Sequence, residues 1–186
     1  GGNNNVYCQD NEIAWMDWEN LERASELHDF TRRLIALRRD HPVFRRRRFL
    51  AGGALGDEEH GREIAWLTPE AAQMTQDDWN APFGRALMVY LDGETISEPD
   101  ARGQRVVDDS FLLMFNAHYE DIDFTVPGSE FGDEWEVVVD TTEALGVRDD
   151  AAPAQPGGTV SVGQRSTVVL RRTQPPAGEG NVEAYQ

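Results

Sequence analysis

The sequence predicts a mostly β chain, in which an antiparallel β-sandwich follows an aromatic loop and one amphipathic helix. Hydrophobic residues make up 39% of the 186 residues, enough to build a core. Apolar side chains recur at helical spacing in one segment only. From Phe44 onward, about eight short apolar runs alternate with Gly, Pro, Asp and Asn, which is the pattern of a β-sandwich.

The first twenty residues predict a structured loop. Three consecutive Asn residues at 3–5 favour turns over a helix or a strand. Tyr7, Trp15 and Trp18 are large apolar rings, so we expect the loop to pack against another surface. Its amide and carboxylate groups beside aromatic rings suit sugar hydroxyls and sugar ring faces. They equally suit a loop whose polar groups bond one another, and the residues alone leave both interpretations open.

The next segment predicts the helix, over residues 21–40. Asn20 is a suitable N-cap, and Pro42 disfavours helical geometry at His41, so the helix should end at about Asp40. A helix with one apolar stripe must dock on another body to bury it. The stripe has steps of three, four and three residues and consists of Leu27, Phe30, Leu34 and Leu37.

The rest of the chain predicts strands, joined by turns and by a long connection over Glu70–Arg85 in which Trp79 is the expected anchor. Pro and Gly from Thr173 onward predict a frayed tail. The expected strands are Arg48–Leu50, Ile64–Leu67, Ala86–Leu91, Phe111–Asn116, Ile122–Val126, Trp135–Asp140, Thr159–Val162 and Thr167–Arg171.

The charge balance excludes some partners. The 17 basic residues are all Arg, against 34 acidic ones, which gives a formal net charge of −17. A surface this acidic argues against nucleic acid and against anionic membranes. No apolar stretch approaches the roughly 18 residues of a membrane span. The single cysteine, Cys8, excludes an internal disulfide, and a cytoplasmic location is expected.

The pairs of acidic residues and the run of Arg residues are interpreted as surface charges that face water or pair with opposite charges. Asp108-Asp109 is the one acidic pair considered for a cation, although loop charges in water are the preferred interpretation. The run Arg45–Arg48 is interpreted as pairing with carboxylates, with a polyanion patch as the alternative. The histidines lack metal-ligand spacing, and phosphate-binding or nucleophile-elbow motifs are missing. We therefore expect no cofactor, no metal and no catalytic residue within this chain.

The opening segments, 2–13 and 15–18, resemble the loop after the eighth barrel strand of bacterial glycogen debranching enzymes, the isoamylase-type members of glycoside hydrolase family 13. Residues 30–38 and 41–44 resemble the last barrel helix of that family and its exit. Four later segments resemble its C-terminal β-domain: 64–67, 74–75, 78–79 and 108–118. The resemblance covers the chain from Gly1 to about Arg172.

The resemblance implies a division into three parts. Residues 1–43 would be the last loop and helix of a (β/α)8 catalytic barrel, 44–172 the C-terminal β-sandwich domain, and 173–186 a flexible tail. The parent enzyme would hydrolyse α-1,6-glucosidic branch linkages of glycogen or limit dextrin with a retaining mechanism. Its three catalytic carboxylates belong to segments before Gly1, so none falls in this chain. The chain opens without Met, and we expect it to be an excerpt whose partners are the missing barrel and, through the parent, branched α-glucan.

The resemblance also implies a candidate binding site, because a loop after a barrel strand lies on the active-site rim. The residues expected to line glucosyl subsites or to shape that rim are Asn4, Asn5, Tyr7, Gln9 and Asp10. A stand-alone glucan-binding module is the alternative, and it predicts exposed aromatics on one sandwich face, among Trp66, Trp79 and Trp135. A position in the core is the preferred interpretation for each of these three residues. A purely structural domain without a ligand is the third hypothesis.

Overall fold

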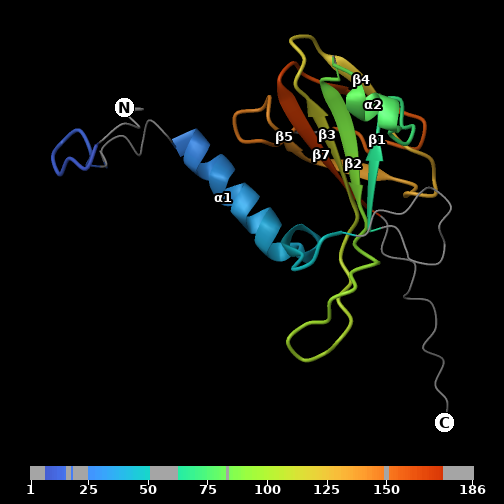
Figure 1. The fold of residues 1–186 in the computed structure, drawn as a ribbon, viewed down its shortest axis with the longest axis horizontal. Helices are drawn as coiled ribbons and strands as arrows, with labels where there is room; N and C mark the ends of the chain where they lie inside the picture. Colours follow the sequence, from blue (N-terminus) through green and yellow to red (C-terminus); the bar gives the residue numbers. More distant parts are fainter. Residues whose placement is uncertain are drawn as a thin grey trace.

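The computed structural model describes residues 7–15, 18, 25–50, 63–82, 84–148 and 151–173. Figure 1 shows a β-sandwich with one long helix projecting from it. The helical elements are α1 (Ser25–Asp40), the 3-10 turn η2 (Pro42–Arg45) and α2 (Gln76–Asn80). The strands are β1 (Ile64–Leu67), β2 (Ala86–Leu91), β3 (Phe111–Asn116), β4 (Ile122–Thr125), β5 (Trp135–Asp140), β6 (Thr159–Val162) and β7 (Ser166–Arg172).

The strands form two antiparallel sheets. Five of them make one sheet in the order β1-β2-β3-β7-β5, and β4 pairs with β6 in the second. The register is continuous between β2 and β3, from Ala86 opposite Asn116 to Leu91 opposite Phe111. A bulge between Val137 and Val139 interrupts the pairing of β5 with β7. The mostly β, sandwich fold class that the sequence predicts is therefore confirmed.

The main core lies between the two sheets. Strand residues alternate faces, so Leu112 and Met114 of β3 point inward toward Phe124 of β4. Trp135 of β5 is fully buried in this core. This confirms the core position that the sequence favours for Trp135 and excludes it from an exposed aromatic face, because its ring fills the space between the sheets beside Tyr90.

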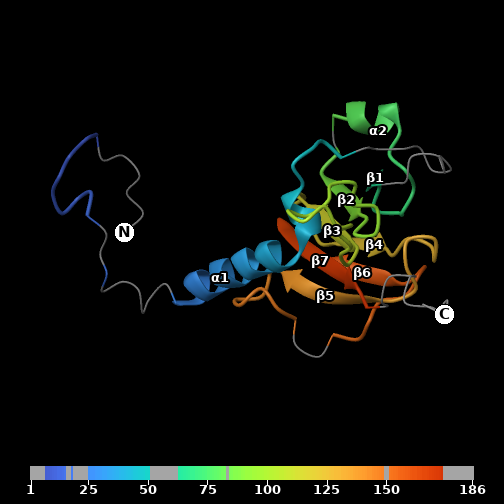
Figure 2. The ribbon, with the colours of Figure 1, turned by 90° about the horizontal axis from the view of Figure 1, so that it is seen from below.

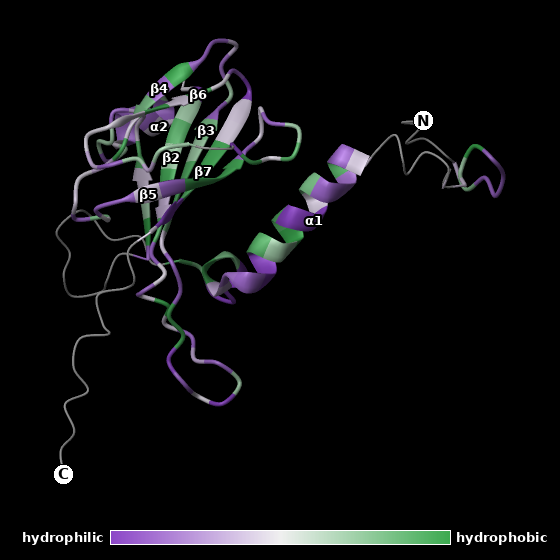
Figure 3. Cartoon of the chain, turned by 180° about the vertical axis from the view of Figure 1, so that it is seen from behind, coloured by the Kyte–Doolittle hydropathy of each residue, from purple (hydrophilic) through white to green (hydrophobic). Residues whose placement is uncertain are grey.

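The outer face of the five-stranded sheet carries a second apolar cluster, on which the helical segment docks. Val43 is buried there, and Phe44 lies 4.6 Å from Phe111 between ring centroids. Phe30 and Leu37 pack against the same cluster. The rest of α1 extends away from the sandwich, as Figure 2 shows. Figure 3 shows hydrophobic and hydrophilic residues interleaved along α1, and Leu27 of the predicted stripe remains exposed.

The predicted end of the helix and most of the predicted strands are confirmed. The helix ends at Asp40, as the position of Pro42 predicts. The expected capping residue, Asn20, lies outside the described residues. Seven of the eight expected strands are present. Thr173 hydrogen-bonds Glu134 through its backbone and its hydroxyl, and the remainder of the expected tail, 174–186, lies outside the described residues.

Arg48–Leu50 is not a strand, contrary to the prediction. The backbone N–H groups of Arg47 and Arg48 both donate to Glu98 Oε1 at 3.1 Å, so the chain bends around one carboxylate. Arg46 pairs with Glu98 and with Glu63, which confirms the interpretation of the basic run for this member.

The connection after β1 also differs from the prediction, because it contains the short helix α2. Thr75 and Asp78 form a reciprocal capping box at its start. The Thr-x-x-Asp spacing is the sequence signal for this box.

In the described part of the chain, we find no helix with the length and apolar character that a membrane crossing requires.

Candidate functional site

The N-terminal loop, where the sequence predicts a sugar-binding rim, lies beyond the N-terminal end of α1 and away from the sandwich (Figure 1). Tyr7, Gln9 and Asp10 are exposed, with Tyr7 at 82%. Asn4 and Asn5, the other two predicted residues, lie outside the described residues. The structure thus brings the three described members into one exposed turn.

Hydrogen bonds inside the loop satisfy part of its polar surface. The indole Nε1–H of Trp15 donates to Asp10 Oδ1 at 2.8 Å. The side-chain amide of Asn11 donates to Gln9 Oε1 at 3.4 Å, and the backbone carbonyl of Asn11 accepts from the N–H groups of Ala14 and Trp15. The loop is held by its own bonds, while the Tyr7 ring faces solvent. This geometry supplies both an ordered turn and an exposed aromatic face.

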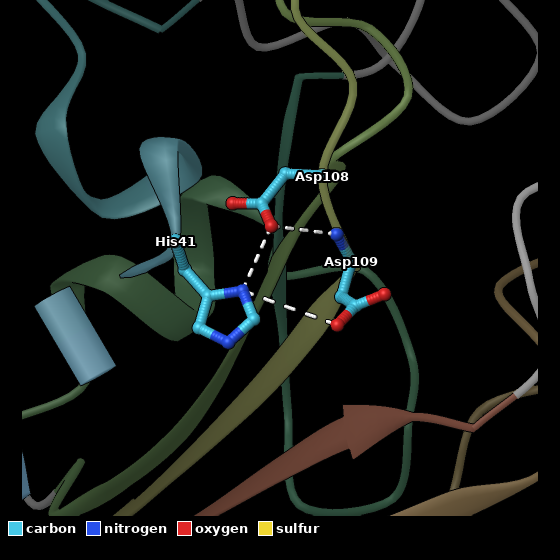
Figure 4. Close-up of side chains that lie close together, drawn as sticks. All are labelled: His41, Asp108 and Asp109. Carbon is cyan, nitrogen blue, oxygen red and sulfur yellow. Dashed lines mark hydrogen bonds and ion pairs between the residues drawn. The ribbon is translucent and has the colours of Figure 1, made fainter. Parts of the chain in front are cut away.

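A second cluster joins the helix to the sheet and was not apparent from the sequence. His41, directly after α1, lies beside Asp108 and Asp109 at the start of β3 (Figure 4). Its Nδ1 is 2.8 Å from Asp108 Oδ1 and 3.9 Å from Asp109 Oδ2. The backbone N–H of Val43 donates to the other oxygen, Asp108 Oδ2, at 2.9 Å. Asp108 thereby binds both His41 and Val43, the residues that follow α1, and joins them to the sheet.

The approach of the chain segments at this junction needs a glycine. A Cβ on Gly93 would lie 2.2 Å from the backbone oxygens of both Asp108 and Asp109. Only a residue without a side chain allows the end of β2 to come this close to the start of β3. The turn signal Asp92-Gly93 marks this position in the sequence, although it does not reveal which segment approaches.

The same three side chains carry ligand atoms of the kinds that a divalent cation accepts, within 4.8 Å of one another. The two oxygens of Asp108 already accept three hydrogen bonds, from His41, Val43 and the backbone N–H of Asp109. Asp109 lies 3.7 Å from Arg171. Because protein donors satisfy these carboxylates, the cluster is best explained as a structural clamp between α1 and the sheet.

A third feature is an exposed aromatic group at the β1 edge of the sheet. The Trp66 and Trp79 rings pack edge to face, with centroids 5.4 Å apart and an interplanar angle of 72°. They remain 39% and 48% exposed, and Phe115 on β3 is 38% exposed. The core position that the sequence favours is therefore wrong for Trp66 and Trp79, which lie partly exposed at the sheet edge.

Trp79 and Phe115 line a hollow of about 250 Å³, which we call the aromatic hollow. Its rim carries two charged groups. Arg85 is exposed, and its side chain forms no ion pair or hydrogen bond with any residue that the structure describes. Asp78 binds Thr75 through Oδ2. The other members of its lining are Met74, Ala81, Gly84, Ala86, Leu87 and Ala117.

Comparison with known proteins identifies the β-domain. Residues 63–172 match the family described as "Isoamylase, C-terminal". The chain belongs to the isoamylase C-terminal family. This match includes every strand of the sandwich, the capping box of α2, and all residues that line the aromatic hollow.

Relatives of this isoamylase-type chain are proteins of glycogen metabolism. The glycogen operon protein GlgX homolog of Mycobacterium tuberculosis is 48% identical over 172 residues, which is 92% of this chain and 24% of the relative. The glycogen debranching enzyme of Salmonella typhi is 33% identical over 130 residues, 70% of this chain and 16% of that protein. The chain thus spans a quarter or less of the length of these relatives.

Two solved structures with a similar fold are pullulanases. The pullulanase from Bacillus acidopullulyticus aligns with a TM-score of 0.56 and 17% identity, over 92% of this chain and 17% of its own. The type I pullulanase of Bacillus subtilis, solved with maltose, aligns with a TM-score of 0.51 and 20% identity, over 87% and 18%. At these identities the likeness establishes the fold of the isoamylase-type domain and no more.

Proposed function

We propose that this chain is the non-catalytic C-terminal part of a debranching hydrolase that cleaves α-1,6-glucosidic branch linkages of glycogen or limit dextrin. The observation that carries the proposal is the 48% identity to the GlgX homolog, because it extends over 92% of the chain and so reaches beyond the β-domain to include helix α1. The 33% identity to a glycogen debranching enzyme supports the same activity.

In this proposal the chain supplies structure to a catalytic barrel that carries the reacting carboxylates. Residues 1–43 complete the barrel with its last loop and helix, and 44–172 form the domain beside it. The clamp of His41 and Asp108 fixes the exit of α1 to the five-stranded sheet. The exposed part of the α1 stripe, which includes Leu27 and Leu34, then has the barrel strands as its packing partner.

The N-terminal loop would lie on the active-site rim, where Asn4, Asn5, Tyr7, Gln9 and Asp10 contact glucosyl units or shape the groove. Tyr7 offers an exposed ring, and Gln9 offers an amide on the same turn. We also propose a cytoplasmic location and no nucleic-acid or membrane partner, which rests on the single cysteine and the net charge of −17.

The experiment compares kcat/KM of the complete enzyme for release of linear chains from glycogen limit dextrin. Tyr7→Ala and Gln9→Ala each remove a rim contact, and we expect about a tenfold loss for Tyr7→Ala, the equivalent of one aromatic contact with its hydrogen bond. Tyr119→Ala, an exposed ring on the sandwich, is the matched control.

The outcomes separate two claims. Unchanged kcat/KM in both rim variants would refute the rim assignment while leaving the debranching activity in place. A complete wild-type enzyme that releases no linear chains from any α-1,6-branched glucan would refute the proposed function itself.

A further inference from the structure

The aromatic hollow, which lies between α2, the start of β2 and the end of β3, combines features of a carbohydrate contact. We propose that it binds a short stretch of α-glucan, with Trp79 and Phe115 as the ring platform and with Arg85 and Asp78 as the polar partners. The choice of α-glucan as the ligand rests on the proposed function. The hollow itself is an observation on the β-domain and does not depend on the N-terminal loop.

The aromatic platform is held in place by contacts within the protein. Trp79 sits on α2, whose start is fixed by the capping box of Thr75 and Asp78. Its ring packs edge to face on Trp66 of β1, and this contact holds it while about half of its surface stays exposed. Phe115 projects from the outer face of β3, which alternates with the buried face that carries Met114. A fixed aromatic surface loses little conformational freedom on binding.

The polar groups at the rim are suited to hydroxyls. Arg85 has no partner among the described residues, so its guanidinium N–H groups are available as donors. Both side-chain bonds that Asp78 accepts from Thr75, each 2.7 Å long, end on Oδ2. Oδ1 therefore remains an acceptor on the same side chain. A donor fork and a carboxylate oxygen beside an aromatic ring are the groups that hold one face of a sugar.

The size and position of the hollow favour a glucan chain over a protein surface. At about 250 Å³ it lies just below the roughly 300–1,000 Å³ of enclosed small-molecule pockets, so it fits contact with a few sugar units at most. Charged residues are depleted at the centre of protein interfaces, whereas this hollow has two. α1 lies beside β5, whereas the hollow lies over α2, the start of β2 and the end of β3.

The test is affinity electrophoresis of the 186-residue chain in native gels that contain graded concentrations of glycogen, with glycogen-free gels as the reference. We expect Trp79→Ala to weaken the apparent affinity at least about fivefold and Arg85→Ala about twofold. Phe49→Ala removes a fully exposed ring that does not line the hollow, and it should match the wild type. Arg85→Ala removes no buried contact, so it keeps the test valid if Trp79→Ala unfolds.

Equal retardation of the wild type, Trp79→Ala and Arg85→Ala would overturn the proposal. So would a complete enzyme in which Trp79→Ala lowers the melting temperature and leaves glycogen affinity unchanged, because the hollow would then be covered by protein. A complete enzyme that does not debranch, together with variants of this chain that lose glycogen affinity, would refute the proposed function and retain the hollow as a glucan site. A complete enzyme that debranches, together with variants of this chain whose glycogen affinity is unchanged, would retain the proposed function and refute the hollow as a glucan site.

Discussion

Asp140, at the end of β5, shows how this acidic chain keeps a charge inside its fold. Its side chain is fully buried, and Oδ1 accepts from the backbone N–H of Thr142 at 2.9 Å and from its hydroxyl at 2.7 Å. Oδ2 accepts from Arg148 Nε at 2.9 Å. Burial alone would raise the pKa of Asp140, but the bonds from Thr142 and Arg148 outweigh it and lower the pKa. The carboxylate therefore stays ionised and paired.

This pairing predicts a pH-dependent contribution to stability. Asp140→Asn removes one partner of a pair whose Arg148 is one-third exposed, so we expect a loss of about 2–3 kcal/mol in unfolding free energy at pH 7. Because the pKa of Asp140 is lower in the folded than in the unfolded chain, its stabilisation is present above about pH 4 and is lost as pH falls further. Urea unfolding at pH 7 and pH 3 checks this, with the exposed Asp123→Asn as control. A gap between wild type and Asp140→Asn that stays constant with pH would contradict it.

At the scale of elements, the docking of α1 depends on a close contact with the loop after β5. A Cβ on Gly146 would lie 2.4 Å from the Phe30 ring, and Gly146 has a φ of +69°. Gly103 has a similar φ of +79°, but nothing lies within 4 Å of its Cβ position. Alanine at either position carries the strain of a left-handed backbone, roughly 1–2 kcal/mol, and only Gly146→Ala also displaces Phe30.

We therefore expect Gly146→Ala to loosen α1, while Gly103→Ala leaves its docking intact. Amide hydrogen exchange in α1 should speed up about tenfold in Gly146→Ala relative to Gly103→Ala, because the helix loses its anchoring ring. The exchange of β3 and β7 amides should be equal in the two variants. Equal exchange of the α1 amides in both variants would show that Phe30 does not hold the helix.

The elements also show what the sequence can and cannot predict. The strands from Ile64 onward are predictable because apolar runs between turn residues must pair somewhere. Arg48–Leu50 also precedes a pair of glycines, but the backbone N–H of Arg48 donates to Glu98, 50 residues away, instead of pairing in a sheet. His41 and Asp108 are 67 residues apart, and no local pattern reports their bond. The sequence does not show whether Trp66 and Trp79 are buried or exposed, because their exposure depends on β1 being the edge strand of the sheet.

In the whole molecule, different features lie at different parts of the five-stranded sheet. The β5 edge holds α1, whose stripe residues Leu27 and Leu34 remain 66% and 38% exposed, and the aromatic hollow lies by α2, β2 and β3. An apolar helix stripe without a cover in the described structure is the feature of a part that packs on a larger body. The exposed stripe therefore supports the proposal that α1 packs against a larger body.

The most direct test of this claim is the mass and activity of the native polypeptide, captured from its source cells with an antibody against the chain. We predict a polypeptide several times heavier than 20.9 kDa that releases linear chains from glycogen limit dextrin. A native polypeptide of about 21 kDa that leaves the branch linkages intact would contradict the account.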